Sequence, residues 1–345
     1  MSDEWSGVCV AHVRLITLLS TTIALGVSAC MSEETPTEPL ISSAATRPYL
    51  AVDLGVPGEN SGATDINASG QIVGRAGNQA AIWEGGGRKE LGFLGAAGCC
   101  SFATAINSAG EVAGGASNAS GDTHAFLWKS GVMRDLGTLG GDASVAFGIN
   151  PAGEIVGGAA TASGETRAFL WKNGVMKNLG TLGRTSLARD INPSGQVLGE
   201  AVLMAGGVHA FLWRRGVLTD LGTLGGENSL PMAINSKGQV VGSSFTGPDE
   251  IHAFLWERGV MRDLGLLGGV RLSFATDINA RGQLVGYLNT HAGAFRAFLW
   301  DRGVVTLLDT PPGGSSRGEG INDRGDVVGS TQLASGEIHA TLWTR

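Results

Sequence analysis

The chain has 345 residues, of which 56 are Gly and 10 are Pro, while 43% are hydrophobic and 16% are charged. So much Gly excludes an ordinary helical domain, and so little Pro beside so many apolar residues excludes a collagen-like or disordered chain. The net charge is -7 and no run of Lys and Arg exceeds two residues, which argues against a nucleic-acid partner. We expect a folded chain with a large apolar core.

A signal peptide is predicted over residues 1–29. Residues 15–29 are uncharged and mostly apolar, and they follow Arg14. This segment is shorter than the about 20 apolar residues that a membrane-spanning helix needs. It is typical of the apolar region of a secretory signal, which follows a positive charge and precedes small residues. The sequence therefore predicts export.

Residues 27–30, VSAC, resemble the lipobox of bacterial lipoproteins. In lipoproteins this Cys is acylated on sulfur and becomes the first residue of the mature chain. The resemblance implies that Cys30 anchors the protein to a membrane of the cell envelope. The alternative is a plain cleavable signal in which Cys30 is incidental. The segment before Arg14 is long and partly acidic, so a start near Val13 is a further hypothesis.

A flexible tether is predicted between the lipidated Cys30 and residue 48. Residues 31–48 contain three Glu, three Pro and several Ser and Thr, with no periodic apolar pattern. Such a composition does not support a packed core and suits a spacer between an anchor and a domain. We expect the folded domain to span 49–345.

Residues 49–345 consist of seven copies of one unit. The motif I-N-x-x-G recurs at intervals of 40 to 44 residues and begins at Ile66, Ile106, Ile149, Ile191, Ile234, Ile278 and Ile321. A second motif, AFLW or a close variant, ends at Trp83, Trp128, Trp171, Trp213, Trp256, Trp300 and Trp343. The constant order and spacing indicate a repeat architecture.

Each unit predicts four short antiparallel strands. In the third copy the apolar segments are separated by Gly-containing turns at residues 150–153 and 162–165 and by Asn173-Gly174. An Asn followed three residues later by Gly favours a tight turn in which the Asn side chain caps local amides. Asn-Gly between apolar segments favours a hairpin.

We interpret the seven units as a seven-bladed β-propeller of four-stranded antiparallel blades. The period matches one blade, and seven copies fall within the roughly four to eight blades of propellers. The domain starts with a fourth-strand segment, residues 49–55, and ends with a third-strand segment, residues 340–343. Pairing these two segments closes the ring and covers both sheet edges. The alternative fold is an open β-solenoid.

The motif HAFLW, complete at residues 124–128, 209–213 and 252–256, together with INxxGxVVG and DLGTLGG, is similar to the HAF-repeat family of bacterial extracellular proteins. The resemblance covers essentially the whole of 49–345. It implies secretion and a β-rich repeat fold. It offers no catalytic residue, because the family is named for its repeat.

The His and Trp residues of the repeat are interpreted as structural. His occupies one repeat position in four copies, at His124, His209, His252 and His339. Equivalent positions of a ring point in different directions, so these side chains cannot converge on one metal ion or substrate. We expect each His either to cap a blade turn or to pair across the strand, and each Trp to fill the wedge between neighbouring blades.

Candidate ligand-binding residues are those at which the copies differ. The residue before I-N-x-x-G is acidic in three copies, at Asp65, Asp190 and Asp277, and Arg189 and Glu319 are adjacent candidates. If the first strand of each blade is innermost, these side chains lie near the channel, where they could hold calcium or a hydroxyl-rich ligand. The alternative is that each Asp accepts a neighbouring turn amide. No other cofactor and no catalytic residue is assigned.

Cys99 and Cys100 are adjacent in the second copy. In an exported protein they are predicted either to form a vicinal disulfide or to remain two small thiols.

Two main functions remain open. The favoured one is a lipid-anchored, monomeric module that binds a polysaccharide or a partner protein at the cell surface. The second is a lyase or hydrolase acting on a polymer, in which channel carboxylates and Arg189 do the acid and base work. The sequence lacks common catalytic motifs such as HExxH and GxSxG, and the closest approach to a unique site is His291 and Tyr287 near Asp277. A purely structural role is the third alternative.

Overall fold

The structure, a computed structural model, describes residues 48–345 except 96–98, 248 and 270. The predicted signal peptide, the predicted anchor Cys30 and the predicted tether up to residue 47 lie outside the described residues. The described chain contains 28 β-strands, which form seven four-stranded antiparallel sheets. We number the sheets as blades 1 to 7 along the chain.

The first three blades comprise the strands β2 (Ser61–Ile66), β3 (Ile72–Ala76), β4 (Gln79–Glu84) and β5 (Gly87–Gly92); β6 (Ser101–Ile106), β7 (Val112–Ser117), β8 (Thr123–Lys129) and β9 (Val132–Asp135); and β10 (Gly140–Ile149), β11 (Ile155–Thr161), β12 (Thr166–Lys172) and β13 (Val175–Asn178). Blades 4 and 5 comprise β14 (Thr185–Ile191), β15 (Val197–Val202), β16 (Val208–Arg214) and β17 (Val217–Asp220); and β18 (Ser229–Ile234), β19 (Val240–Phe245), β20 (Ile251–Glu257) and β21 (Val260–Asp263). Blades 6 and 7 comprise β22 (Ser273–Ile278), β23 (Leu284–Asn289), β24 (Phe295–Asp301) and β25 (Val304–Leu307); and β26 (Ser316–Ile321), β27 (Val327–Gln332), β28 (Ile338–Thr344) and β1 (Leu50–Asp53).

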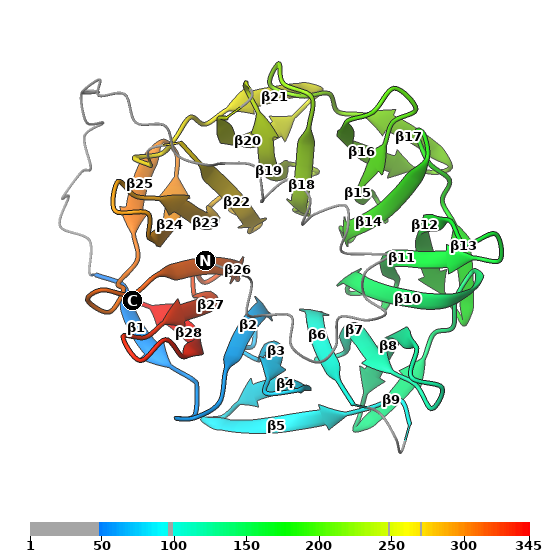
Figure 1. Ribbon diagram of the computed structural model, residues 1–345, viewed down its shortest axis with the longest axis horizontal. Helices are drawn as coiled ribbons and strands as arrows, with labels where there is room; N and C mark the ends of the chain where they lie inside the picture. Colours follow the sequence, from blue (N-terminus) through cyan, green and yellow to red (C-terminus); the bar gives the residue numbers. More distant parts are fainter. Residues whose placement is uncertain (1–47, 96–98, 248, 270) are drawn as a thin grey trace.

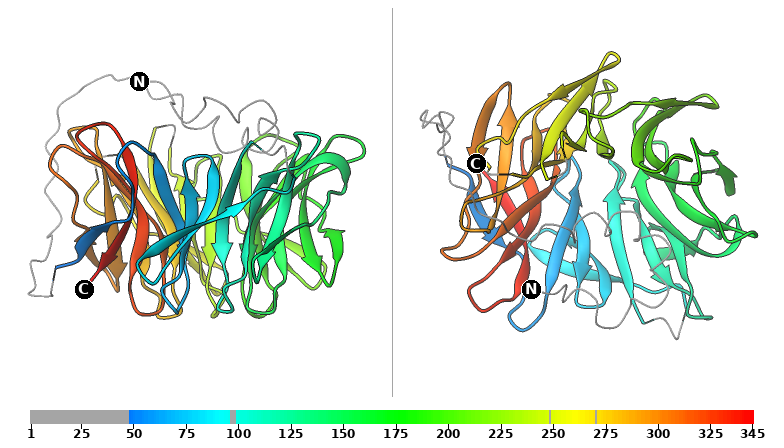
Figure 2. Two further views of the ribbon diagram at one scale, coloured as in Figure 1. Left: turned by 90° about the horizontal axis from the view of Figure 1, so that it is seen from below. Right: turned by 45° about the horizontal axis from the view of Figure 1, so that its top comes forward.

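The seven blades stand in a ring around a common axis, and we use the word channel for the space between their innermost strands (Figure 1). The first strand of each repeat faces the channel and the fourth lies outermost, so the predicted β-propeller is confirmed. Seen from the side, the ring is a disc whose strands run between two faces (Figure 2). We call the face that carries the I-N-x-x-G turns the Asn-ring face, and the opposite face, where one blade connects to the next, the loop face.

The predicted closure of the ring is also confirmed. Strand β1 pairs with β28 in antiparallel register, with Leu50 opposite Thr344 and Asp53 opposite Thr341. The Asp53 carboxylate accepts a hydrogen bond from Nδ1 of His339 at 2.9 Å, across the join between the two ends of the domain. Blade 7 is therefore built from both ends of the domain, and β1 covers the outer edge of β28.

The turns have the predicted chemistry. In blade 3, Asn150 Oδ1 accepts hydrogen bonds from the backbone N–H groups of Ala152 and Glu154, both at 3.0 Å. Gly153 follows with φ of 74°, a left-handed conformation that favours Gly. The hairpin turn Asn173-Gly174 has positive φ at both residues, 53° and 84°, as a type I′ turn requires.

A second Gly of the repeat is fixed by close packing of two strands. An added Cβ at Gly157 on β11 would collide with the carbonyl oxygen of Val145 on β10 and with the ring of Phe169 on β12. Phe169 is fully buried, so it has no room to give way. The same collision with a carbonyl oxygen of the first strand occurs at the equivalent residues Gly74, Gly114, Gly199, Gly242, Gly286 and Gly329.

Neighbouring blades are joined by one buried Ser each. Ser144 Oγ on β10 accepts a hydrogen bond from the N–H of Ala125 on β8 at 2.9 Å and donates to the carbonyl oxygen of Gly137 at 2.6 Å. The other six joints use the pairs Ser61 and Ala340, Ser101 and Ala80, Ser186 and Ala168, Ser229 and Ala210, Ser273 and Ala253, and Ser316 and Ala297. Every blade is thus bonded to the next in the same way.

The repeated Trp lies at the same joints, as predicted. The guanidinium of Arg134 on β9 lies 5.4 Å from the ring centroid of Trp171 in the next blade. Lys89 and Trp128, Lys177 and Trp213, and Arg262 and Trp300 make equivalent contacts. Each contact adds a cation–π attraction to the apolar packing between two blades.

Candidate functional site

The channel ends, on the Asn-ring face, in a ring of seven Asn side chains. Each Asn Nδ2 donates a hydrogen bond to the backbone carbonyl oxygen of the equivalent Asn in the next blade, at 3.0 to 3.4 Å, around the series Asn67, Asn107, Asn150, Asn192, Asn235, Asn279 and Asn322. All seven are buried. The side chains of the repeated Asn therefore hold neighbouring blades together.

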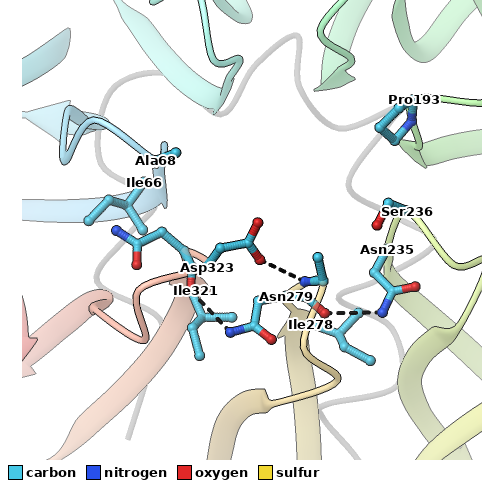
Figure 3. Close-up of a pocket in the computed structure, with 11 residues that line it drawn as sticks. Ile66, Ala68, Pro193, Asn235, Ser236, Ile278, Asn279, Ile321 and Asp323 are labelled. Atoms are coloured by element: carbon cyan, nitrogen blue, oxygen red, sulfur yellow. Dashed lines mark hydrogen bonds between the residues drawn. The ribbon is translucent and has the colours of Figure 1, made fainter.

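A cavity of about 250 Å³ lies inside this ring. Figure 3 shows side chains from five of the seven blades around it, among them Ile66, Pro193 and Asn279. Asp323 is its charged residue, and that carboxylate already accepts the backbone N–H of Ala280 at 2.8 Å. The cavity is therefore lined mainly by turn backbone and by small or apolar side chains.

Each of the three predicted Asp residues comes two residues before an Asn of the ring, and its carboxylate bonds two neighbouring blades together. Asp277 Oδ1 accepts the N–H of Ile278 at 2.7 Å, and its Oδ2 accepts the N–H of Ile321 in the next blade at 2.8 Å. Asp65 bonds Ile66 and Ile106 in the same way, and Asp190 bonds Ile191 and Ile234. This is the structural alternative considered above.

The three carboxyl groups also influence one another. The pKa of Asp277 is raised to about 8, mainly by burial and also by the charges of Asp65 and Asp190, although two backbone N–H groups oppose the rise. Burial likewise raises the pKa of Asp65 to about 6 and raises the pKa of Asp190. The three carboxylates lie at three different joints between blades, and a protonated Asp277 contributes no charge to a cation site near neutral pH. The described residues contain no group of three or more His, Cys, Asp or Glu that could hold a metal ion.

Arg189, another predicted site residue, is held by a partner that the sequence analysis missed. Its Nη2 lies 2.6 Å from Oε1 of Glu200 on β15, which is 1% exposed. Its guanidinium also lies 5.1 Å from the ring centroid of Phe147 in blade 3. Glu200 could have been found as the acidic residue at a repeat position that is Gly115 in blade 2 and Gly158 in blade 3.

Glu319, the last predicted site residue, lies apart from this ion pair in blade 7. Burial raises the pKa of Glu319 to about 7, and the nearby guanidinium of Arg317 opposes the rise. Its carboxylate makes no hydrogen bond with any described residue. Arg317, on the same strand, is a second residue that the sequence analysis missed. The sequence does mark Arg317 as unusual, because the residues at the same repeat position in the other six blades, from Gly62 to Phe274, are uncharged.

The repeated His is structural, as predicted. His124 Nδ1 lies 2.8 Å from Oδ2 of Asp135 on the neighbouring strand, and His209 with Asp220 and His252 with Asp263 form the same pair. The hydrogen bond to Asp135 raises the pKa of His124, although burial opposes the rise. The sequence contains a signal for this pairing, because His is followed eleven residues later by Asp within blades 2, 4 and 5.

The grouping of His291, Tyr287 and Asp277 that the enzyme alternative needed is not found. Asp277 is the fifth residue of β22, next to the Asn ring. His291 is exposed in the connection after β23, whose last residue is Asn289, at the loop face. The two residues therefore lie at opposite ends of blade 6.

The vicinal disulfide between Cys99 and Cys100, one of two predicted alternatives, is not formed in this structure. Cys99 is a free, exposed thiol, and its Sγ lies 3.0 Å from Sγ of Cys100. Both Sγ atoms also lie within 3.5 Å of Ser117 Oγ.

The chain is a seven-bladed β-propeller of four-stranded blades, and its ring is closed by the pairing of β1 with β28. No protein-family model matches it, and no curated protein does either. The resemblance to HAF repeats therefore stays a prediction. Among the described residues, no helix is both long and apolar enough to cross a membrane.

Solved structures match the fold at low sequence identity. The propeller domain of the trilobed protease from Pyrococcus furiosus is 13% identical, with a TM-score of 0.52, over 82% of this chain and 95% of that one. A prolyl endopeptidase structure is 14% identical, with a TM-score of 0.56, over 82% and 50%. TolB from Acinetobacter baumannii is 12% identical, with a TM-score of 0.47, over 83% and 64%. The chain thus spans half of the endopeptidase and 64% of this TolB. The likenesses to the trilobed protease domain and to the endopeptidase establish the fold alone.

Proposed function

We propose that the protein is an exported module, anchored through Cys30, that binds a polysaccharide at the cell surface. The observation that carries the proposal is that the repeated side chains have structural roles, whereas the side chains that depart from the repeat do not. The repeated Asn, Ser, His and Trp bond one strand or blade to another. Charged and aromatic departures from the repeat gather on the inner strands and beside them, as Arg189 and Arg317 do.

The join at blade 7 supports an orientation for such a module. Leu50 pairs with Thr344, next to Trp343, which pairs with Val327, and Val327 pairs with Ile321 beside the Asn ring. The chain therefore enters the ring at the Asn-ring face. A tether before residue 49 would hold this face nearer the membrane and leave the loop face toward the surroundings.

A rigid ring with a few singular side chains suits recognition of a hydroxyl-rich polymer. Its frame is fixed by repeated hydrogen bonds, so the binding groups do not need to be ordered when the ligand arrives. Aromatic and charged residues near one end of the channel supply stacking and hydrogen bonding at fixed positions. Because the seven blades are similar, the charged and aromatic residues that occur in single blades are the main source of specificity.

The test is binding of the purified full chain to an array of glycans and cell-wall polymers, with and without calcium, beside the heat-unfolded protein. We expect a signal for one class of polysaccharide that the unfolded protein lacks. Absence of any glycan signal would contradict the proposal and favour a partner protein or a structural role. A calcium-dependent signal would revive the predicted cation site.

Anchoring is tested separately in a bacterial host. A fatty-acid label should be incorporated into the native chain and should be lost in Cys30→Ser. If the native chain is secreted without label, the anchor is absent and export alone remains of this part of the proposal.

A further inference from the structure

Blade 6 carries an aromatic cluster near the loop face. The rings of Phe274 on β22 and Tyr287 on β23 are stacked, with centroids 4.9 Å apart, and Tyr287 meets Phe295 on β24 edge-on at 5.4 Å. All three side chains are only partly buried. At the position of Tyr287, blades 2 and 3 have Gly115 and Gly158, so this cluster is not part of the repeat.

The guanidinium of Arg317 lies over this cluster from blade 7. Its Cζ is 4.7 Å from the ring centroid of Phe295 and 5.0 Å from that of Tyr287. The residue is exposed, and among the described residues the guanidinium makes neither a hydrogen bond nor an ion pair. The rings of Tyr287 and Phe295 therefore hold the guanidinium of Arg317 in place, and its N–H groups can donate hydrogen bonds to a ligand.

This arrangement matches the requirements of a carboxylate ligand. A guanidinium is planar and presents N–H donors in a fork that fits both oxygens of a carboxylate. Contact with two aromatic rings restrains the guanidinium before the ligand arrives, which reduces the entropy lost on binding. Glu319, two residues along β26, makes no hydrogen bond and can bond a hydroxyl group beside the carboxylate.

We propose that Arg317 and Glu319 form a subsite for an acidic sugar, a ring that carries a carboxylate next to hydroxyl groups, at the loop-face end of the joint between blades 6 and 7. The carboxylate of the sugar binds the guanidinium of Arg317, and a hydroxyl binds Glu319. This inference rests on the proposed polysaccharide function and names the ligand class and the site.

The experiment measures binding of trigalacturonate to the purified full chain by calorimetry, with its fully methyl-esterified form as the uncharged counterpart. Arg317→Gln should weaken trigalacturonate binding tenfold or more, because a charge-assisted bond pair is lost. Arg317→Lys should recover only part of the affinity, since an ammonium lacks the fork. Arg302→Gln, at an arginine that is 91% exposed in blade 6, makes the same change of net charge and should leave binding unchanged.

Glu319→Ala should also weaken binding, and Glu319→Gln, which keeps hydrogen-bonding atoms, should retain most of it. The methyl ester should bind weakly to the native protein and should not distinguish the native protein from Arg317→Gln. Circular dichroism of each variant shows whether the blades are intact.

The outcomes separate the site from the function. If folded Arg317→Gln binds trigalacturonate as the native protein does, or if the native protein binds only neutral polymers, the subsite is wrong and the polysaccharide function stands. If no glycan binds, both proposals are wrong. If a peptide with a free carboxyl terminus binds through Arg317 and its amidated form does not, the site recognises a peptide carboxylate and the sugar class is overturned.

Discussion

Asn322 Nδ2 donates a hydrogen bond to the backbone carbonyl oxygen of Asn67 at 3.3 Å, across 255 residues of sequence. This bond completes the ring of seven Asn side chains, which otherwise runs from each blade to the next along the chain. The side chain has a second task, since Asn322 Oδ1 accepts the N–H groups of Arg324 and Asp326 in its own turn. One side chain thus fixes both a turn and the closure of the propeller.

Asn322→Asp removes the donor of the closing bond. The aspartate keeps the acceptors for the turn but replaces Nδ2, which also donates to Asp326 Oδ2 at 3.0 Å, with an oxygen that faces both the carbonyl of Asn67 and the carboxylate of Asp326. We expect a loss of about 2 kcal/mol, because a buried acceptor loses its donor, and a fall of roughly 2–5 °C in the melting temperature.

The matched control for this change is Asn178→Asp. Asn178 is exposed, and the equivalent residue is Asp in blades 2, 4 and 5. Scanning calorimetry of both variants should show the fall only in Asn322→Asp. Equal melting temperatures would mean that the Asn ring does not stabilise closure.

Gly74→Ala should destabilise blade 1 by about 2 kcal/mol or more, because overpacking forces backbone to move. The added methyl group would collide with the carbonyl oxygen of Gly62 and approach Cα of Ala63 within 2.9 Å. Gly62→Ala is the control, since nothing lies within 4 Å of its added Cβ. Thermal unfolding should separate the two variants, and a Gly62→Ala protein that melts as low as Gly74→Ala would contradict the packing argument.

The pair of His124 and Asp135 should stabilise the fold only within a window of pH. The hydrogen bond to Asp135 raises the pKa of His124, so the stabilisation is present below the ordinary His value and is lost as the pH rises through the raised pKa. Although burial opposes it, the same hydrogen bond lowers the pKa of Asp135, so the stabilisation is also lost as the pH falls through that lowered pKa.

An NMR titration of the imidazole signals checks this pair. In Asp135→Asn the pKa of His124 should fall toward about 6.5, the value of a free imidazole. The imidazole chemical shifts of His209, which pairs with Asp220 in another blade, should match those of the native protein. An unchanged pKa for His124 would show that the pair carries no charge interaction.

Stability should decrease as the pH rises from about 4 to about 8, through Asp277. Burial raises the pKa of this carboxyl to about 8 in the folded protein. Over this range the unfolded chain has lost the proton and the folded protein retains it, so the folded state binds more protons and the free energy of unfolding falls with pH.

Removal of the acid should flatten this dependence. Asp277→Asn should be less stable than the native protein at pH 5, because one backbone N–H loses its acceptor, but its slope of unfolding free energy against pH should be smaller. Asp249→Asn, at an exposed residue, should keep the native slope. A slope that Asp277→Asn leaves unchanged would place the titration elsewhere.

The fold was predictable because each repeat carries its own turn and core signals. Asn150 and Gly153 mark the first turn, and residues 49–55 mark the missing fourth strand, so blade number and closure both follow from periodicity. The pairing of His124 with Asp135 was predictable in kind, because both residues recur with one spacing.

The roles of the channel residues were harder to predict. Asp277 accepts an N–H from Ile321, 44 residues away, and sequence spacing does not show which of two neighbouring blades supplies a donor. Glu200 reaches Arg189 across paired strands within one blade, and Arg317 reaches Tyr287 between two blades. A residue that differs from its repeat position in a single blade indicates a candidate site, but only the packing of neighbouring strands shows which residues it contacts.

The construction of blade 7 also sets an order for folding of a chain that emerges from its amino-terminal end. Six blades consist of consecutive strands and can form in turn, whereas β1 must wait for β28, almost three hundred residues later. Until then β1 is an unpaired strand, and such strands pair readily with other chains. The ring therefore closes only after the last strand has emerged, and a partly emerged chain is most open to wrong pairing at its first strand.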